Sequence, residues 1–275
     1  MTYTTVMASL ILGRPNTQVL DATVRIAAKF DAGVIGLAAC RPIQTVCHDY
    51  AVPAALFDED RREIARHMEA GEREFRRAVA ALAGRTEWRA HTTILPLAEH
   101  LSRQARNADL VVISTEPGDG ECDATRRPDV CDVVMSAGRP VLLVPDGAAT
   151  KGWDRVVVAW KDTREARRAI VDALPLLKAA AKTTIVAIAD DEELPETRSS
   201  VAEVVSWLGH HGIATESRVT SPSGANASDL DAIARELEAD LVVAGAYGYI
   251  RQGRWVLGGI TSQLFGGSRC AIVAH

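Results

Sequence analysis

An internal repeat constrains the fold of this chain more than any other feature of its sequence. Residues 108–112 read Ala-Asp-Leu-Val-Val, and the same five residues recur at 239–243. Each copy follows a stretch with helical spacing and precedes a glycine-containing segment and a short apolar run, at 140–144 and at 270–274. Because the period lies far above the roughly 50 residues of solenoid repeats, the pattern predicts two duplicated domains.

The length of the chain agrees with two domains. It has 275 residues, and a domain commonly has about 100–150. A small, polar, turn-rich stretch at 145–152 separates the two halves, and an apolar run at 155–160 follows it directly. We therefore expect one domain at residues 1–146 and another at residues 154–275.

The second half alternates between strand-like and helix-like segments. Continuous apolar runs at 183–189 and 241–244 predict buried strands, whereas helical spacing at 228–238 and the position of 255–265 predict helices. Short apolar strands that alternate with helices are typical of a parallel sheet covered on both faces. The first half follows the same order. The sequence thus predicts an α/β protein of two tandem doubly wound domains, each a five-stranded parallel sheet with flanking helices.

Composition and charge exclude several classes of function. The net charge is -5, which does not favour binding to nucleic acid or to an anionic membrane. No apolar run approaches the roughly 20 residues of a membrane-spanning helix. The five cysteines are irregularly spaced and the first residues lack a basic segment, so we expect a cytoplasmic protein. The charged run at 58–77 interleaves acids and bases at helical spacing, which we interpret as a solvated helix face.

A glycine-rich segment carries the strongest functional signal. Gly245 and Gly248 are separated by two residues, and nine further residues lead to Gly258. Glycines let backbone N–H groups approach an anion closely, and the N-terminus of a following helix adds a favourable dipole. Ligands of open α/β sheets bind beyond the carboxyl ends of the strands. The segment therefore predicts a phosphate-binding loop, although the same glycines could serve only in turns and in close helix–sheet packing.

This spacing resembles the fingerprint of the universal stress proteins, which is glycine, two residues, glycine, nine residues, glycine and then serine or threonine. Residues 157–166 also look like the first strand and turn of that family. The resemblance covers residues 154–275 closely and 1–146 mainly through their architecture, and it is to tandem bacterial members. It implies Rossmann-like domains and a stress-response protein that binds ATP or another adenine nucleotide in its C-terminal domain.

Two positions depart from the family pattern. Lys161 stands where ATP-binding members carry an aspartate that contacts adenine, and Asp162 follows one residue later. Gly259 stands where those members have a serine or threonine, and the hydroxyl of Thr261 comes two positions later. The resemblance gives the candidate nucleotide-binding residues Lys161, Gly245, Gly248, Gly258, Gly259 and Thr261.

The first half has lost the fingerprint. The segment at 115–128 contains four closely spaced carboxylates, Glu116, Asp119, Glu121 and Asp123, which would repel phosphate. We interpret the first half as a degenerate partner domain. The alternative is that its altered loop binds a different ligand.

Three functions remain open on this reading. The first is a stress-response module that binds a small anionic ligand, and the second is a scaffold or interaction protein in which both nucleotide sites have decayed. An enzyme such as a slow ATPase is the least supported, because the sequence offers no catalytic residue and no metal site. Since family members dimerise through their final strands, we expect the runs at 140–144 and 270–274 to approach each other, in a pseudo-dimeric monomer or in a homodimer.

Overall fold

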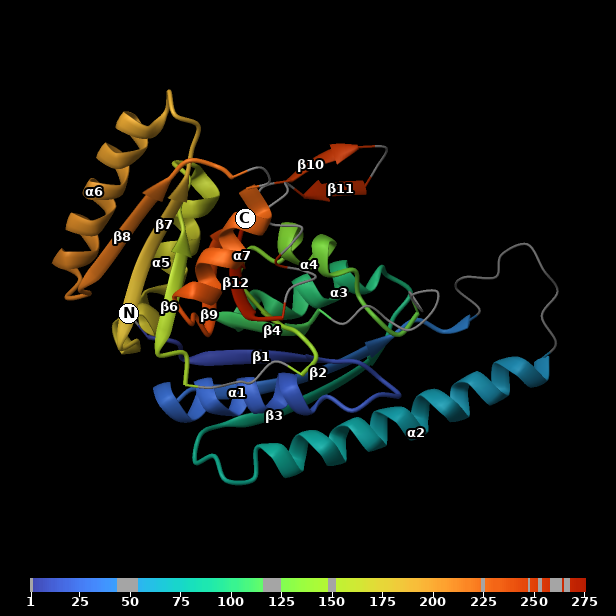
Figure 1. The fold of residues 1–275 in the computed structure, drawn as a ribbon. Coiled ribbons are helices and arrows are strands. Elements are labelled where there is room, and N and C mark those ends of the chain that lie inside the picture. The colour runs from blue at the N-terminus through green and yellow to red at the C-terminus, as the bar shows by residue number, and fades with distance from the viewer. Residues whose placement is uncertain are drawn as a thin grey trace. The chain divides into compact units, whose positions relative to one another are not determined.

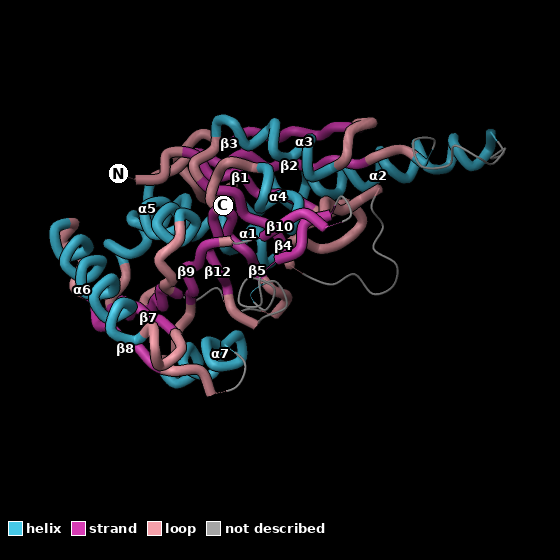
Figure 2. The backbone as a smooth tube through the Cα atoms, turned by 90° about the horizontal axis from the view of Figure 1, so that it is seen from above, coloured by secondary structure: helices cyan, strands magenta, loops and turns pink. Residues whose placement is uncertain are grey.

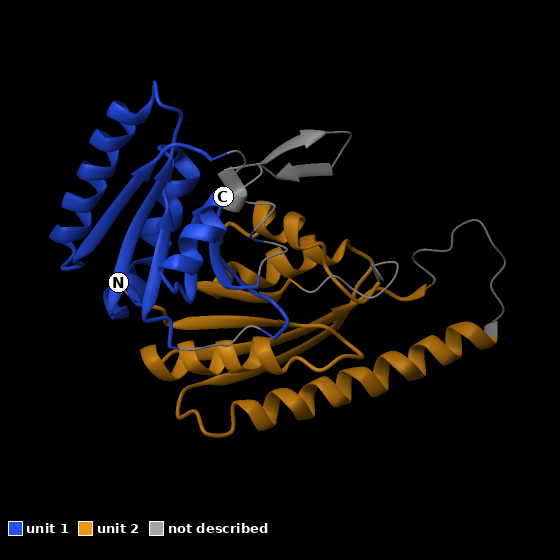
Figure 3. Cartoon of the chain, viewed as in Figure 1, with its two compact units in different colours: residues 1–2, 140–275 blue, residues 3–139 orange. Residues whose placement is uncertain are grey.

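The computed structural model describes residues 2–43, 54–115, 125–147, 152–223, 226–246, 248–251, 254–257, 264 and 268–275. The chain divides into two compact units (Figure 3). Unit 2 comprises Tyr3–Arg139, and unit 1 comprises Pro140–His275 together with Met1–Thr2. Each unit is an α/β structure, as the sequence predicts. None of the helices in the described ranges has both the length and the apolar character needed to cross a bilayer.

Unit 2 is built on parallel strands in the order β3-β2-β1-β4. Helices α1 and α2 cover one face of these strands, and α3 and α4 cover the other (Figure 1). The elements in chain order are β1 (Thr5–Leu10), α1 (Thr17–Phe30), β2 (Gly33–Cys40), α2 (Ala54–Ala78), β3 (Thr86–Thr92), α3 (Leu97–Gln104), a 3₁₀ turn (Ala105–Asn107), β4 (Leu110–Ser114) and α4 (Val130–Ser136).

Unit 1 has strands in the order β5-β12-β9-β6-β7-β8, with α5 and α6 on one side and α7 on the other (Figure 2). All neighbouring pairs are parallel except β5 with β12. The elements are β5 (Val141–Val144), β6 (Arg155–Ala159), α5 (Arg164–Ala179), β7 (Lys182–Ile188), α6 (Leu194–His210), β8 (Thr215–Thr220), α7 (Asn226–Glu236), β9 (Leu241–Gly245), β10 (Gly248–Arg251), β11 (Arg254–Leu257) and β12 (Cys270–Ala274).

The aspartate of the repeated motif has the same structural role in both units. In unit 2, a carboxylate oxygen of Asp109 accepts hydrogen bonds from the backbone N–H groups of Thr4 at 2.7 Å and Thr5 at 3.0 Å. In unit 1, the carboxylate of Asp240 accepts from the N–H groups of Asp154 at 2.9 Å and Arg155 at 3.1 Å. Each aspartate therefore satisfies donors at the start of the neighbouring strand, which would otherwise lack partners.

The expected count of five strands in each half is confirmed, since β1–β5 precede the linker and β6–β9 with β12 follow it in the main sheet. The first repeat contributes its fifth strand, β5, to the sheet of unit 1, where Leu143 pairs with Ala271 in antiparallel register. Among the described residues, unit 1 therefore has six strands in its main sheet, and unit 2 has the four named above. The expected approach of the two final strands is confirmed, and it gives β12 a hydrogen-bonded partner on each side, which removes an exposed edge.

The expected helix over 255–265 is wrong at its start. Residues Arg254–Leu257 form strand β11, which pairs antiparallel with β10 (Figure 1). Tyr249, Ile250, Trp255 and Val256 have high strand propensity, which favours a pair of strands here over the start of a helix. Apart from residue 264, the rest of the expected helix lies outside the described residues.

Candidate functional site

The candidate site lies at the point where the strand order of unit 1 reverses. The chain runs outward from β6 through β7 to β8 and then returns to β9 on the other side of β6. Strands β6 and β9 are parallel and in register, with Val156 opposite Leu241 and Ala159 opposite Ala244. Their carboxyl ends therefore share one edge of the sheet, and the crevice at such a reversal is where open α/β folds bind ligands.

Gly245, the last residue of β9, packs directly on the first turn of α5. A Cβ atom at this position would lie 2.4 Å from the backbone nitrogen of Ala166 and 2.7 Å from the carbonyl carbon of Glu165. Both neighbours are backbone atoms of a helix, which cannot shift as a flexible side chain can. Glycine is therefore required for this close approach of strand and helix.

The side chain of Thr163 caps the N-terminus of α5. The hydroxyl of Thr163 accepts a hydrogen bond from the N–H of Ala166 at 3.3 Å, which is the usual role of an N-cap threonine. Glu165 in the same turn is largely buried and pairs with Arg164 at 3.2 Å. Burial raises the pKa of Glu165, but hydrogen bonds from its own backbone N–H and from Thr163, together with the Arg164 charge, outweigh burial and lower the pKa overall.

Lys161 leaves the sheet beside these groups. It is exposed, as is the following Asp162, whose carboxylate pairs with Arg167 at 2.8 Å. The preceding residue, Trp160, is buried, and its indole N–H donates to the hydroxyl of Ser200 in α6 at 3.1 Å. Trp160 thus anchors the end of β6, so that the chain emerges at Lys161 with an ammonium group in solvent.

The structure brings two of the six candidate residues to the same edge, namely Lys161 after β6 and Gly245 at the end of β9. Gly248 follows three residues later as the first residue of β10. Gly258, Gly259 and Thr261 lie outside the described residues, as do the acidic residues Glu116, Asp119, Glu121 and Asp123 of the first half. The use of all of these residues in binding or excluding a ligand stays a prediction.

His275 is a neighbour of this edge that the sequence did not reveal. Its Nδ1 lies 3.1 Å from the carbonyl oxygen of Ala246, and the N–H of Ala246 donates to the carbonyl of Ala274 at 2.7 Å. The register of β12 with β9, in which Ala274 lies opposite Gly245, carries the histidine there. Only the pairing of these two strands could have indicated it.

Groups of three or more side chains able to hold a metal ion do not occur among the residues for which side chains are described. The acidic groups at the candidate edge, Asp162 and Glu165, each face an arginine of α5. Among the described side chains, the edge therefore combines the exposed ammonium of Lys161 with carboxylates that are paired to arginines. This arrangement suits an anion better than a cation.

Comparisons of the chain with family models and with curated proteins find no match. Among solved structures, a universal stress protein from Archaeoglobus fulgidus aligns over 98% of this chain and 97% of its own, with a TM-score of 0.71 and 14% identity. A protein of unknown function from Pseudomonas aeruginosa aligns over 99% of this chain and 92% of its own, with a TM-score of 0.60 and 13% identity.

At this level of identity the comparison establishes the fold. The chain has the α/β fold of a universal stress protein along its whole length, so the resemblance noted from the glycine spacing is confirmed for the architecture. A shared fold does not establish a function, which has to be argued from the site.

Proposed function

We propose that this chain is a stress-response protein that binds a small anionic ligand, an adenine nucleotide in the first instance, in unit 1. The observation that carries the proposal is the contact of Gly245 with the first turn of α5 at the strand-order reversal. This contact places the end of β9 against the N-terminal turn of α5, where N–H donors and the helix dipole favour anions. The proposed phosphate contacts are the backbone groups of Gly245, Gly248, Gly258 and Gly259, assisted by Thr261.

Lys161 determines which part of the ligand the site would recognise. An ammonium group donates three hydrogen bonds and accepts none, so it can reach phosphate oxygens but cannot accept from the adenine amine. Its exposed position after β6 leaves it able to turn toward the loop. We therefore expect weak selectivity between ATP, GTP and inorganic triphosphate.

A scaffold with decayed nucleotide sites is the second candidate. The capping of α5 by Thr163 favours it, because that hydroxyl already uses one of the N–H donors that a phosphate would need. In both cases we propose a cytoplasmic binding protein without catalytic residues. Nucleic acid and membrane are not among the proposed partners. The pairing of β5 with β12 within unit 1 supports a pseudo-dimeric monomer over a homodimer.

Two measurements test the proposal. Mass spectrometry of small molecules released from the purified protein would identify a retained ligand. Calorimetric titration with ATP, GTP and triphosphate would follow, using the wild type, Gly248→Asp and the control Gly209→Asp, because Gly209 in α6 has open space around it.

Binding of all three compounds that is lost in Gly248→Asp and kept in Gly209→Asp supports the proposal. Lys161→Asp should restore a preference for ATP over GTP, because a carboxylate can accept from the adenine amine. Equal binding by the wild type and Gly248→Asp would place the ligand elsewhere. No binding by the wild type would leave the scaffold as the function.

A further inference from the structure

One face of α2 in unit 2 carries three polar residues at intervals of seven. They are Asp60, His67 and Glu74. Positions seven apart lie on the same side of a helix. All three contact segments that follow the carboxyl ends of β1 and β2, which is the edge where an open α/β sheet binds its ligand.

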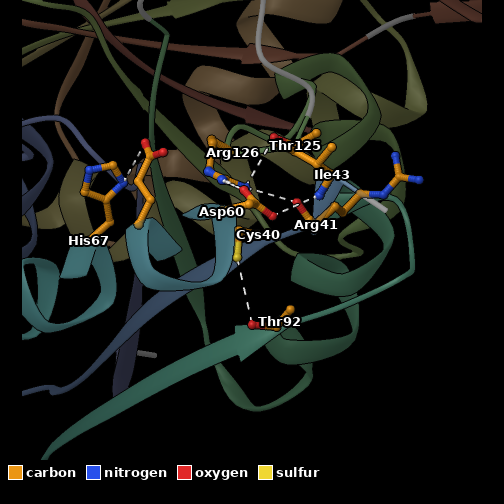
Figure 4. Close-up of polar contacts among 9 residues, drawn as sticks. Cys40, Arg41, Ile43, Asp60, His67, Thr92, Thr125 and Arg126 are labelled. Atoms are coloured by element: carbon orange, nitrogen blue, oxygen red, sulfur yellow. Dashed lines mark hydrogen bonds and ion pairs between the residues drawn. The ribbon is translucent and has the colours of Figure 1, made fainter. Parts of the chain in front are cut away.

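Asp60 makes the most buried of these contacts (Figure 4). Its side chain is 3% exposed, and its Oδ1 accepts from Nη2 of Arg126 at 2.5 Å. Its other oxygen accepts from the backbone N–H of Ile43 at 3.1 Å. Arg126 also donates to the carbonyl oxygen of Arg41, just beyond β2, at 3.0 Å. A carboxylate of α2 thus satisfies both a guanidinium and a backbone donor at the end of β2.

Glu74 also satisfies donors beyond the end of β1, here those of Asn16. Its Oε1 accepts from the backbone N–H of Asn16 at 2.7 Å, and its Oε2 accepts from the side-chain amide of Asn16 at 3.3 Å. Asn16 is buried, and its Oδ1 accepts from the N–H of Ile11 at 2.7 Å. His67 lies between the two carboxylates along α2. A Cβ atom added to Gly13, whose φ is +79°, would lie 3.0 Å from the imidazole of His67.

Apolar contacts hold α2 in this position. Ile64 belongs to a buried cluster with Leu12, Ala38 and Cys40, against which Met68 packs. Farther along the helix, a Cβ atom on Gly36 of β2 would lie 2.6 Å from the ring of Phe75. The helix is therefore packed on the sheet both between its polar residues and just beyond Glu74.

We propose that the Asp60 and Glu74 carboxylates act as built-in anions that fill the ligand-binding edge of unit 2, so that the chain binds one ligand molecule, in unit 1. The N–H groups of Ile43 and Asn16 and the guanidinium of Arg126 are donors of the kind that recognise phosphate or carboxylate, and α2 already occupies them. The part of this proposal that concerns unit 1 rests on the proposed function.

Chemical rescue tests the built-in anion without any nucleotide. Asp60→Ala leaves Arg126 and the Ile43 N–H without their acceptor, so its melting temperature Tm should fall well below that of the wild type. Formate should then raise the Tm of the variant in a concentration-dependent way, because an anion that binds only the folded state stabilises it. The wild type and Asp58→Ala, which removes an exposed carboxylate of the same helix, should not show this rise.

Glu74→Ala provides a second variant if Asp60→Ala does not fold. The proposal of a built-in anion would be refuted if formate changed the Tm of Asp60→Ala and Glu74→Ala no more than that of the wild type and of Asp58→Ala. Native mass spectrometry of the wild type with ATP gives the stoichiometry. One nucleotide per chain supports the proposal, and two per chain contradict it. Rescue by formate together with no nucleotide binding would retain the built-in anion and refute the proposed function of unit 1.

Discussion

Gly245→Ala is the most direct perturbation of the candidate edge. The added methyl group would lie 2.4 Å from the backbone nitrogen of Ala166 and 2.9 Å from its Cα atom, well inside normal contact distances. Relief requires β9 and α5 to move apart, and overpacking of this kind costs about 1–3 kcal/mol. For a unit of about 150 residues this corresponds to a fall in Tm of about 2–4 °C for each kcal/mol.

Thermal and urea unfolding of the wild type, Gly245→Ala and Gly209→Ala would measure the effect. Gly209 lies within helix α6 with nothing near its Cβ position, so its replacement by alanine should stabilise the helix by about 0.5–1 kcal/mol. The two glycine-to-alanine changes are thus expected to have opposite signs. A Gly245→Ala protein as stable as the wild type would refute the tight contact between β9 and α5.

Two pH-dependent predictions follow from the titrating groups. Burial, with the charges of His91 and Arg103, lowers the pKa of His100. Only the unfolded chain therefore takes up that proton just below about pH 6.5, and the free energy of unfolding falls there. Urea titrations of His100→Gln should show a flatter fall on the acid side, and a fall as steep as that of the wild type would contradict this prediction. Burial raises the pKa of Asp109, but bonds from Thr4 and Thr5 outweigh it and lower the pKa overall, so ionised Asp109 stabilises above about pH 4 and this stability is lost as the pH falls. In Asp240, burial outweighs the corresponding hydrogen bonds and raises the pKa. At pH 7, Asp240→Asn should therefore lower the free energy of unfolding by less than Asp109→Asn does. Equal urea midpoints for the two variants would argue against these pKa shifts.

The sequence predicts the local part of the fold well. The apolar runs become buried strands, and the repeated aspartate marks equivalent places in both units because it bonds to the start of a neighbouring strand. The place of β5 in the sheet of unit 1 could not be obtained in the same way. The partner of β5 is β12, and such a distant pairing leaves no trace in the periodicity of either segment. At 254–257 the residues suit a strand, and the glycine spacing alone favoured a helix.

The candidate site was predictable only in outline. The order of strands and glycines places Lys161 and Gly245 at one edge, whereas the neighbouring His275 depends on the register of β12. The charged run at 58–77 was interpreted as a solvated face, and for Asp60 this is wrong, because its carboxylate is buried against Arg126. The alternation of charges along a helix does not distinguish a buried carboxylate such as Asp60 from exposed ones, because its hydrogen-bond donors come from segments far away in the sequence.

The pairing of β5 with β12 has a consequence for biosynthesis. A ribosome releases β5 long before β12, the strand that it must join, so the sheet of unit 1 cannot close until β12 has emerged. When β12 emerges, both of the strands with which it pairs, β5 and β9, have already been synthesised. A fragment cut at the linker, from residue 154 onward, would present β12 with an unpaired edge and should aggregate. A fragment that begins at Pro140 would carry its own strand to seal that edge.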